Sequence, residues 1–144
     1  MGSDIWRAVR GDLRRILLAV PGVPDIAFEG RDFTPAAGVA FIRERIDKGG
    51  ARTATLGNLG MQEERAIYAI DLNRPRTASF AEGEDLADAI RCAFRPGREI
   101  WGAEYAAGRI VSAHTRTSIM LDAWTQFPIR IEFFFRRSTA QGWT

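Results

Sequence analysis

Side chains that could carry out catalysis are few in this chain and lie far apart. The only histidine, His114, falls inside a strand-like stretch beside Ser112 and Arg116, and no neighbouring residue marks a partner base or nucleophile. The other interpretation of His114 is a strand histidine that faces solvent or has its hydrogen bonds satisfied. Carboxylates are plentiful, but they occur where Asp and Glu normally stand, in helix caps and on polar faces. The sequence therefore predicts a protein that is not an enzyme, and a metal site or an acid–base pair is the alternative.

A single cysteine limits the covalent and metal chemistry of the chain. With Cys92 alone, no intrachain disulfide can form, and the several closely spaced thiolates of a structural zinc site are missing. We interpret Cys92 as a buried, apolar-like residue of a helix. No cofactor and no metal ion are expected.

The glycine-rich stretch that starts at Lys48 is the part most similar to a ligand-binding loop. In a Walker-type phosphate loop the lysine follows the glycines and a helix begins at once, whereas Lys48 precedes Gly49 and Gly50 and no helical pattern follows. Glycines and absent periodicity instead predict a long, flexible connection at about residues 48–62. We predict that it contacts another subunit or a partner protein through Lys48, Arg52, Thr53, Thr55, Leu56, Leu59 and Met61.

Basic residues near this connection suggest a second function. The formal net charge is only +2, and Lys48 is the only lysine. Arg43 and Arg45 precede Lys48 and Arg52, and four cations placed together could bind the phosphate backbone of a nucleic acid. A small nucleic-acid-binding module is therefore the alternative function, and a solvated loop that joins two strands is the interpretation without one.

Composition indicates a folded, water-soluble chain. Hydrophobic residues make up 46% and charged residues 26% of the 144 residues, which is ordinary for a globular domain of this size. We predict one domain over residues 1–144. No apolar run reaches the length of a membrane span, and the start lacks the apolar core of a secretion signal, so we expect synthesis in the cytoplasm without a membrane partner.

Hydrophobic periodicity predicts an α+β fold. Helices are expected at residues 4–20 and about 80–95, the second with a capping box between Ser79 and Glu82. Strands are expected at 25–29, 39–47, 64–73, 99–103, 109–121 and 129–137. The order α-β-β-β-α-β-β-β predicts a single domain with a mainly antiparallel sheet and both helices packed on one face.

The last predicted strand, residues 129–137, is strongly β-prone. At an open sheet edge it would pair with another chain unless Arg136 and Arg137 prevented this, and the alternatives are a central position or pairing across a subunit boundary. Large aromatic residues at the ends of segments, namely Trp101, Trp124, Phe127 and Trp143, pack in the core or anchor an interface.

With the segments laid out, the chain resembles the phage tail terminator-like family, small proteins of tailed phages and prophages that complete the tail or join it to the head. The resemblance covers roughly residues 5–135 and rests on short strings in order, namely Ile26-Ala27-Phe28-Glu29-Gly30, Phe33-Thr34-Pro35, Phe41-Ile42-Arg43, Thr55-Leu56-Gly57, Ile70-Asp71-Leu72 with Pro75, and Leu86-Ala87-Asp88-Ala89-Ile90 with Phe94. The stretch 73–77 departs from the family, which usually has a glycine-bearing turn there.

The resemblance implies a structural role without cofactor or reaction. Such proteins cap the finished tail tube as a homo-oligomeric, hexameric ring, stop its polymerisation and provide the surface on which the head docks. The implied partners are further copies of the chain, the tail tube protein and a head-completion or connector protein, with DNA in the channel as a further contact. The implied location is the host cytoplasm during assembly and then the head-proximal end of the virion tail. A neighbouring head–tail connector is the alternative within this resemblance.

Overall fold

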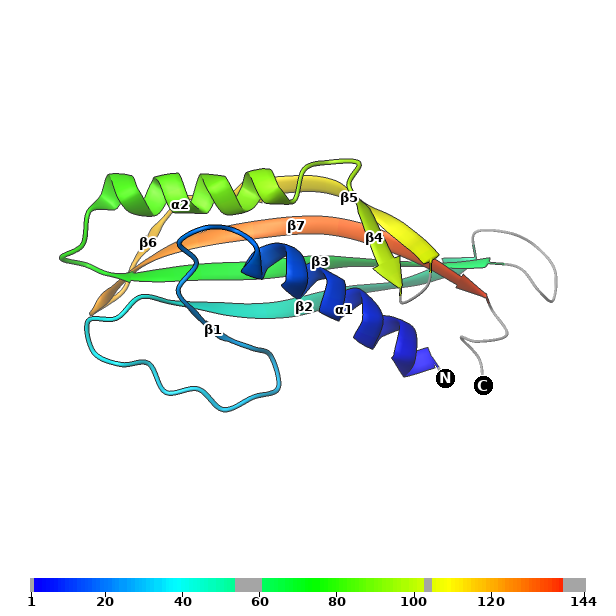
Figure 1. Cartoon of the computed structure of the whole chain (residues 1–144), viewed down its shortest axis with the longest axis horizontal. Coiled ribbons are helices and arrows are strands. Elements are labelled where there is room, and N and C mark those ends of the chain that lie inside the picture. The colour runs from blue at the N-terminus through cyan, green and yellow to red at the C-terminus, as the bar shows by residue number, and fades with distance from the viewer. Residues whose placement is uncertain (1, 54–60, 103–104, 139–144) are drawn as a thin grey trace.

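The structure, a computed structural model, describes residues 2–53, 61–102 and 105–138. These residues form two helices and seven strands, with three strands after the first helix and four after the second (Figure 1). The helices are α1 (Gly2–Leu18) and α2 (Phe80–Ala93). The strands are β1 (Asp25–Ala27), β2 (Phe41–Thr53), β3 (Met61–Pro75), β4 (Glu99–Gly102), β5 (Tyr105–Thr115), β6 (Ile119–Met120) and β7 (Trp124–Ser138).

All strands belong to one sheet with the order β1-β2-β3-β7-β5-β4, and β6 pairs with β7 beside this path. Only β1 runs parallel to its neighbour β2, and the other described pairings are antiparallel. The predicted α+β fold with a mainly antiparallel sheet is therefore confirmed.

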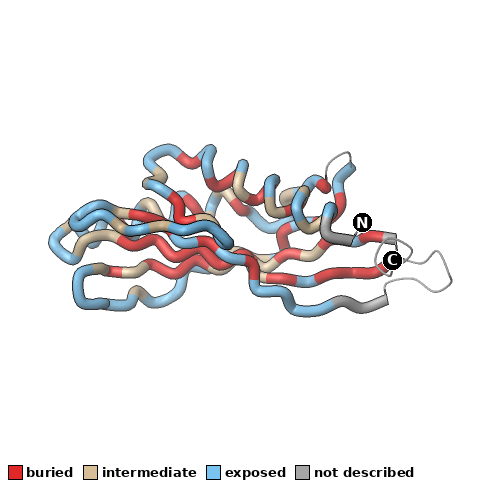
Figure 2. The backbone as a smooth tube through the Cα atoms, turned by 90° about the horizontal axis from the view of Figure 1, so that it is seen from below, coloured by how far each residue is buried: buried red, intermediate tan, exposed pale blue. Residues whose placement is uncertain are grey.

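Both helices cover the same face of the sheet, and buried residues lie between the two layers (Figure 2). From α1, Val9, Leu13 and Leu17 are fully buried, as the apolar arc of this helix predicts. They pack in one core with side chains of the sheet and α2, among them Tyr68, Ile70, Ile90, Ile131 and Phe133. Each such side chain contributes roughly 1.5–3 kcal/mol by leaving water. The predicted placement of both helices on one face is confirmed.

Strand β7 lies in the middle of the sheet. It pairs with β3 over its whole length, with Tyr68 opposite Ile131, and on its other side with β5, where Ile110 stands opposite Phe133. This central position, one of the alternatives left open by the sequence, explains the strong β-propensity of residues 129–135, because both neighbours are strands and the helix-side residues are buried.

The predicted connection at about 48–62 is shorter in the structure, because residues 48–53 continue β2 and Met61 begins β3. A β-bulge explains the glycines: the register shifts between Lys48 and Gly50, so Gly49 is the extra residue. A Cβ atom at Gly49 would lie 3.1 Å from the Arg65 carbonyl oxygen, and Gly50 has φ +99°. Both positions therefore favour glycine for reasons of local geometry.

Two further expectations need correction. The predicted strand 109–121 is interrupted, because β5 ends at Thr115 and the chain resumes pairing only at Ile119, with the Arg116 amide donating to the Pro128 carbonyl at 2.9 Å in between. Cys92 is exposed rather than buried. It stands two positions after the buried Ile90, and about 200° of helical rotation turns it to the outer side of α2.

Candidate assembly interface

Four of the predicted interaction residues, namely Lys48, Arg52, Thr53 and Met61, lie at one end of the long β2–β3 pair. Lys48 is exposed on β2, and its Nζ lies 4.5 Å from the centre of the Trp6 ring, a cation–π contact with α1. Arg52 and Thr53 continue β2 opposite Glu63 and Gln62. Met61 begins β3 opposite Ser138. The remaining three predicted residues, Thr55, Leu56 and Leu59, lie outside the described residues.

The outer edge of β2 is open along this segment. Strand β1 pairs with β2 only from Phe41 to Arg43, and farther along the Ile46 amide donates to Glu29 Oε1 at 3.0 Å. From Asp47 to Thr53, β2 has no strand on its outer side among the described residues. An open edge carries backbone donors and acceptors that can pair with another chain, and the bulge at Gly49 twists it locally. The segment is therefore an open edge, and the bulge and the charged side chains of Asp47 and Lys48 make it less prone to unselective pairing.

The four cations of the predicted basic patch do not form one surface. Arg43 and Arg45 stand at alternate positions of β2 and share a face, whereas Lys48 lies on the opposite, helix-covered side, opposite Ala66. Arg45 contacts Asp47 at 3.0 Å and Asp71 at 3.3 Å. Partial burial lowers the pKa of Arg45, but the two carboxylates outweigh burial, so the pKa lies above its usual value. The negative charges of these carboxylates also compensate much of the positive charge of Arg45.

A buried polar network fixes α1 against β2. Arg14 Nη2 donates to Glu44 Oε1 at 2.7 Å, and the Glu29 amide donates to the same oxygen at 2.8 Å. Burial alone would raise the pKa of Glu44, but the hydrogen bonds from Arg14 and the Glu29 amide hold it below its usual value. Tyr68 lies beside this carboxylate, and burial followed by the Glu44 charge raises the pKa of its hydroxyl. The network sets where the open edge stands relative to the helix.

Charge pairs join β3 to β7 beyond the network. Arg137 Nη2 lies 2.6 Å from Glu64 Oε1, and Arg136 Nη2 lies 3.4 Å from Glu63 Oε1. Arg65 Nε is 2.8 Å from the other oxygen of Glu63. The two arginines that the sequence suggested as guards of an edge therefore pair across the middle of the sheet. No local pattern indicates these pairs, because they depend on the register between strands distant in sequence.

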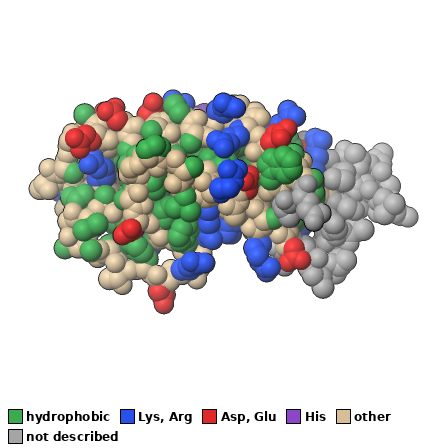
Figure 3. Space-filling model, viewed as in Figure 1, with side chains coloured by type: hydrophobic (Ala, Val, Ile, Leu, Met, Phe, Trp, Pro, Cys, Tyr) green, Lys and Arg blue, Asp and Glu red, His purple; other side chains and the backbone are tan. Residues whose placement is uncertain are grey.

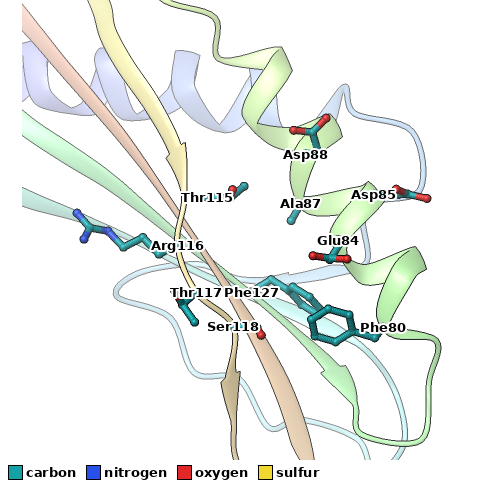
Figure 4. A pocket seen from close by; sticks show the side chains of 10 residues that line it. All are labelled: Phe80, Glu84, Asp85, Ala87, Asp88, Thr115, Arg116, Thr117, Ser118 and Phe127. Carbon is teal, nitrogen blue, oxygen red and sulfur yellow. The ribbon is translucent and has the colours of Figure 1, made fainter.

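A groove that the sequence did not indicate runs between α2 and the chain joining β5 to β6 (Figure 4). It has a volume of about 510 Å³. Acidic side chains of α2 form one wall, Thr115 to Ser118 form the other, and aromatic rings close one end; the lining residues are Phe80, Glu84, Asp85, Ala87, Asp88, Thr115, Arg116, Thr117, Ser118 and Phe127. Figure 4 shows Phe80 next to Phe127, with ring centroids 5.3 Å apart.

The structure places His114, the catalytic candidate of the sequence, away from the helices. His114 is exposed on the helix-free face of the sheet, opposite Arg130. No group of three or more His, Cys, Asp or Glu side chains in the described ranges could hold a metal ion. Neither α1 nor α2 is long and apolar enough to cross a membrane.

Fold and surface together define a small α+β domain with an open sheet edge and several charged surfaces, suited to assembly with other protein chains. Residues 4–133 match the family model of the phage tail terminator protein, and the chain belongs to this family. It is therefore a structural protein of phage tails.

A solved structure supports the fold independently. One chain superposes with a TM-score of 0.69, and the match covers 94% of this protein and 95% of that chain at 17% sequence identity. At this identity the likeness shows a shared fold. No curated protein matches the sequence.

Proposed function

We propose that this protein caps the phage tail tube as a homo-oligomeric ring and forms part of the head–tail junction, without enzymatic activity. Membership of the tail terminator family over residues 4–133 is the observation that carries the proposal. Its partners are further copies of itself, the tail tube protein, and a head-completion or connector protein. It acts in the host cytoplasm during assembly and then at the head-proximal end of the tail.

The β2–β3 end is the surface proposed to meet the tube. Among the described residues no strand pairs with the outer edge of β2 from Asp47 to Thr53, so an extended segment of a tube subunit could add to the sheet there. The interface set predicted from the sequence stays part of the proposal: Lys48, Arg52, Thr53, Thr55, Leu56, Leu59 and Met61.

The nucleic-acid-binding alternative has less support. Arg43 and Arg45 lie on the face opposite Lys48, and Arg45 is engaged by two carboxylates. A phosphate backbone tracks a continuous run of free cations, which these residues do not provide.

Tube assembly in vitro tests the capping function. Purified tube protein of the same phage or prophage is polymerised with and without this chain, and tube lengths are compared. Capping predicts that elongation stops once the chain is added and that it sediments with the tubes. Tubes that keep elongating in its presence would exclude the capping role.

A further inference from the structure

A hollow rich in arginine lies between α1, the chain leaving α2, and β4. It has a volume of about 520 Å³ and is lined by Arg15, Arg95, Pro96, Gly97, Arg98, Glu99 and Trp101. Trp101 is 45% exposed there, which is unusual for so large an apolar side chain. Tryptophan and arginine are both enriched where protein surfaces bind each other, so this pair of residue types is more typical of an interface than of a surface that stays in water.

The hollow is held in place by one buried carboxylate. Asp12, on α1, accepts hydrogen bonds from Arg15 Nε and Nη2 at 2.9 and 2.7 Å. Its other oxygen accepts from the Trp101 amide at 2.9 Å, so a single side chain ties α1 to β4. On the far side, Arg98 Nη1 donates to the Ala93 carbonyl at 2.8 Å, at the end of α2. Arg15 is therefore held on α1 and Arg98 against the end of α2, while Arg95 lies in the turn between α2 and β4.

The chemistry of the hollow favours a carboxylate-bearing partner. Guanidinium groups bind carboxylates in bidentate geometry, and Arg95 makes no ion pair with the described residues. Glu99 also lines the hollow, and its negative charge opposes a densely charged polyphosphate more than a protein surface of mixed charge.

A matching acidic surface lies on the same molecule. We define the acidic ridge of α2 as Glu84, Asp85 and Asp88, all exposed. Glu84 and Asp85 make no ion pair with the described residues, while Asp88 contacts Arg91 at 2.8 Å. Figure 3 shows acidic side chains over the N-terminal half of α2 and a column of basic side chains beyond its other end.

The ridge and the hollow cannot meet within one molecule. Glu84 and Asp85 stand 11 and 10 positions before Arg95, which corresponds to about 15 Å along the direction of α2 at 1.5 Å per residue. Two complementary surfaces at different places on one chain make a heterologous contact between copies, and such a contact closes into a ring when its rotation closes.

We propose that the arginine hollow of one copy receives the acidic ridge of α2 from the next copy, and that this head-to-tail contact builds the oligomer. The proposal rests on the proposed function, because it supplies the contact within the ring. Arg95 and Arg98 would pair with Glu84 and Asp85 of the adjacent copy, and Trp101 would be covered by it.

Charge reversal on each side provides the test. One variant carries Arg95→Glu and Arg98→Glu, and a second carries Glu84→Arg and Asp85→Arg. The matched control is Arg31→Glu, at a residue that is exposed between β1 and β2, at the other end of the sheet from β4. Self-association is measured by analytical ultracentrifugation at low salt, and ring occupancy by electron microscopy of tube ends. Each variant alone should associate at least roughly tenfold more weakly than the control, since like charges then face each other.

Mixing the two variants gives the sharper result. In the mixture, the basic ridge of one variant meets the acidic hollow of the other, and the two unaltered surfaces also fit, so alternating oligomers should re-form. Because Arg98 also donates to the Ala93 carbonyl, Arg95→Glu alone is a third variant that leaves this bond intact, and thermal melting checks that each variant folds.

Three outcomes would overturn the proposal: variants that associate like the control, a mixture that fails to recover, or a wild-type chain that stays monomeric in solution and on tubes. Loss of duplex DNA binding in the hollow variant, with association intact, would identify a phosphate site and also overturn it. Oligomers that respond to charge reversal but do not stop tube growth would leave the contact supported and refute the capping function alone.

Discussion

Arg14 donates to Glu44 across 2.7 Å, and this contact joins the helix layer to the strand whose outer edge is open. Glu44 has no exposed side-chain surface and Arg14 keeps 20% of its own. A buried ion pair costs much to desolvate and is strongly destabilising when one partner is lost. The Arg14–Glu44 pair matters here because it holds α1 over β2, next to the segment proposed to meet the tube.

Replacing Glu44 by Gln should destabilise the protein markedly. The change keeps the shape but leaves the Arg14 guanidinium without a buried counter-charge, and we expect a loss of about 3 kcal/mol in the free energy of unfolding. Urea unfolding measures it. The matched control is Asp47→Asn, which breaks an exposed pair with Arg45 and should change stability by about 1 kcal/mol or less. Equal effects of the two changes would show that the Glu44 network does not hold the layers.

The same carboxylate makes stability depend on pH. The pKa of Glu44 is held below its unfolded value of 4.5, so the unfolded chain binds the proton more readily. Its contribution is therefore fully present above pH 4.5 and is lost as pH falls through the lower pKa of the folded state. Urea midpoints between about pH 3 and 7 should fall less steeply for Glu44→Gln than for the wild type. Parallel profiles would contradict this assignment.

Glycine is required at Gly108 by the close approach of β5 to β7. A Cβ atom there would overlap the carbonyl oxygen of Phe134. Gly108→Ala should therefore cost several kcal/mol or prevent folding, as measured by thermal melting. Gly11→Ala is the control, because nothing lies within 4 Å of a Cβ at that position of α1. That change should stabilise the helix by roughly 0.5–1 kcal/mol.

Edge pairing at β2 can be tested with two changes at Lys48. The Ile46 amide points outward to Glu29, so by the alternation of a strand the Lys48 amide points outward too. Lys48→Pro removes this donor, whereas Lys48→Ala keeps it and removes the side chain with its contact to Trp6, so the pair separates backbone pairing from side-chain contacts. Co-sedimentation with tubes should be lost for Lys48→Pro and retained for Lys48→Ala. If both variants bind alike, the edge is not the contact.

His114→Ala should leave folding and tube binding unchanged. The side chain is exposed on β5 and away from the core. Exposed substitutions of this kind usually change stability by no more than about 0.5 kcal/mol. A measurable loss of tube capping, with an unchanged melting temperature, would give His114 a role that its surroundings do not indicate.

Periodicity was sufficient to predict the helices and the class of the sheet, because Val9, Leu13 and Leu17 repeat at helical spacing and β7 alternates as a strand. Sequence patterns predicted the wrong structure where the same local pattern fits two different structures. Gly49 and Gly50 resemble a flexible loop in the sequence, but they form a bulge in β2. Cys92 was assigned to the buried side of α2, yet the helical phase turns it outward.

Surfaces built from distant residues could not be predicted from the sequence. Asp12 binds both Arg15 and Trp101. The Asp12–Arg15 pair is a local i,i+3 pair of α1, but no local pattern indicates the contact between Asp12 and Trp101, which are 89 positions apart. The pairs Glu63–Arg136 and Glu64–Arg137 depend in the same way on the β3–β7 register. Of the predicted interaction residues, Lys48 lies at the open edge of β2, and its role there stays a prediction.

Electron microscopy of tube ends is the most direct test of the central claim. Tail tubes of the same phage or prophage are incubated with the purified chain and imaged in side view and end-on. Capping predicts a ring of several copies of this protein at one end of each tube, coaxial with the tube wall. Bare ends, or copies scattered along the tube wall, would contradict it.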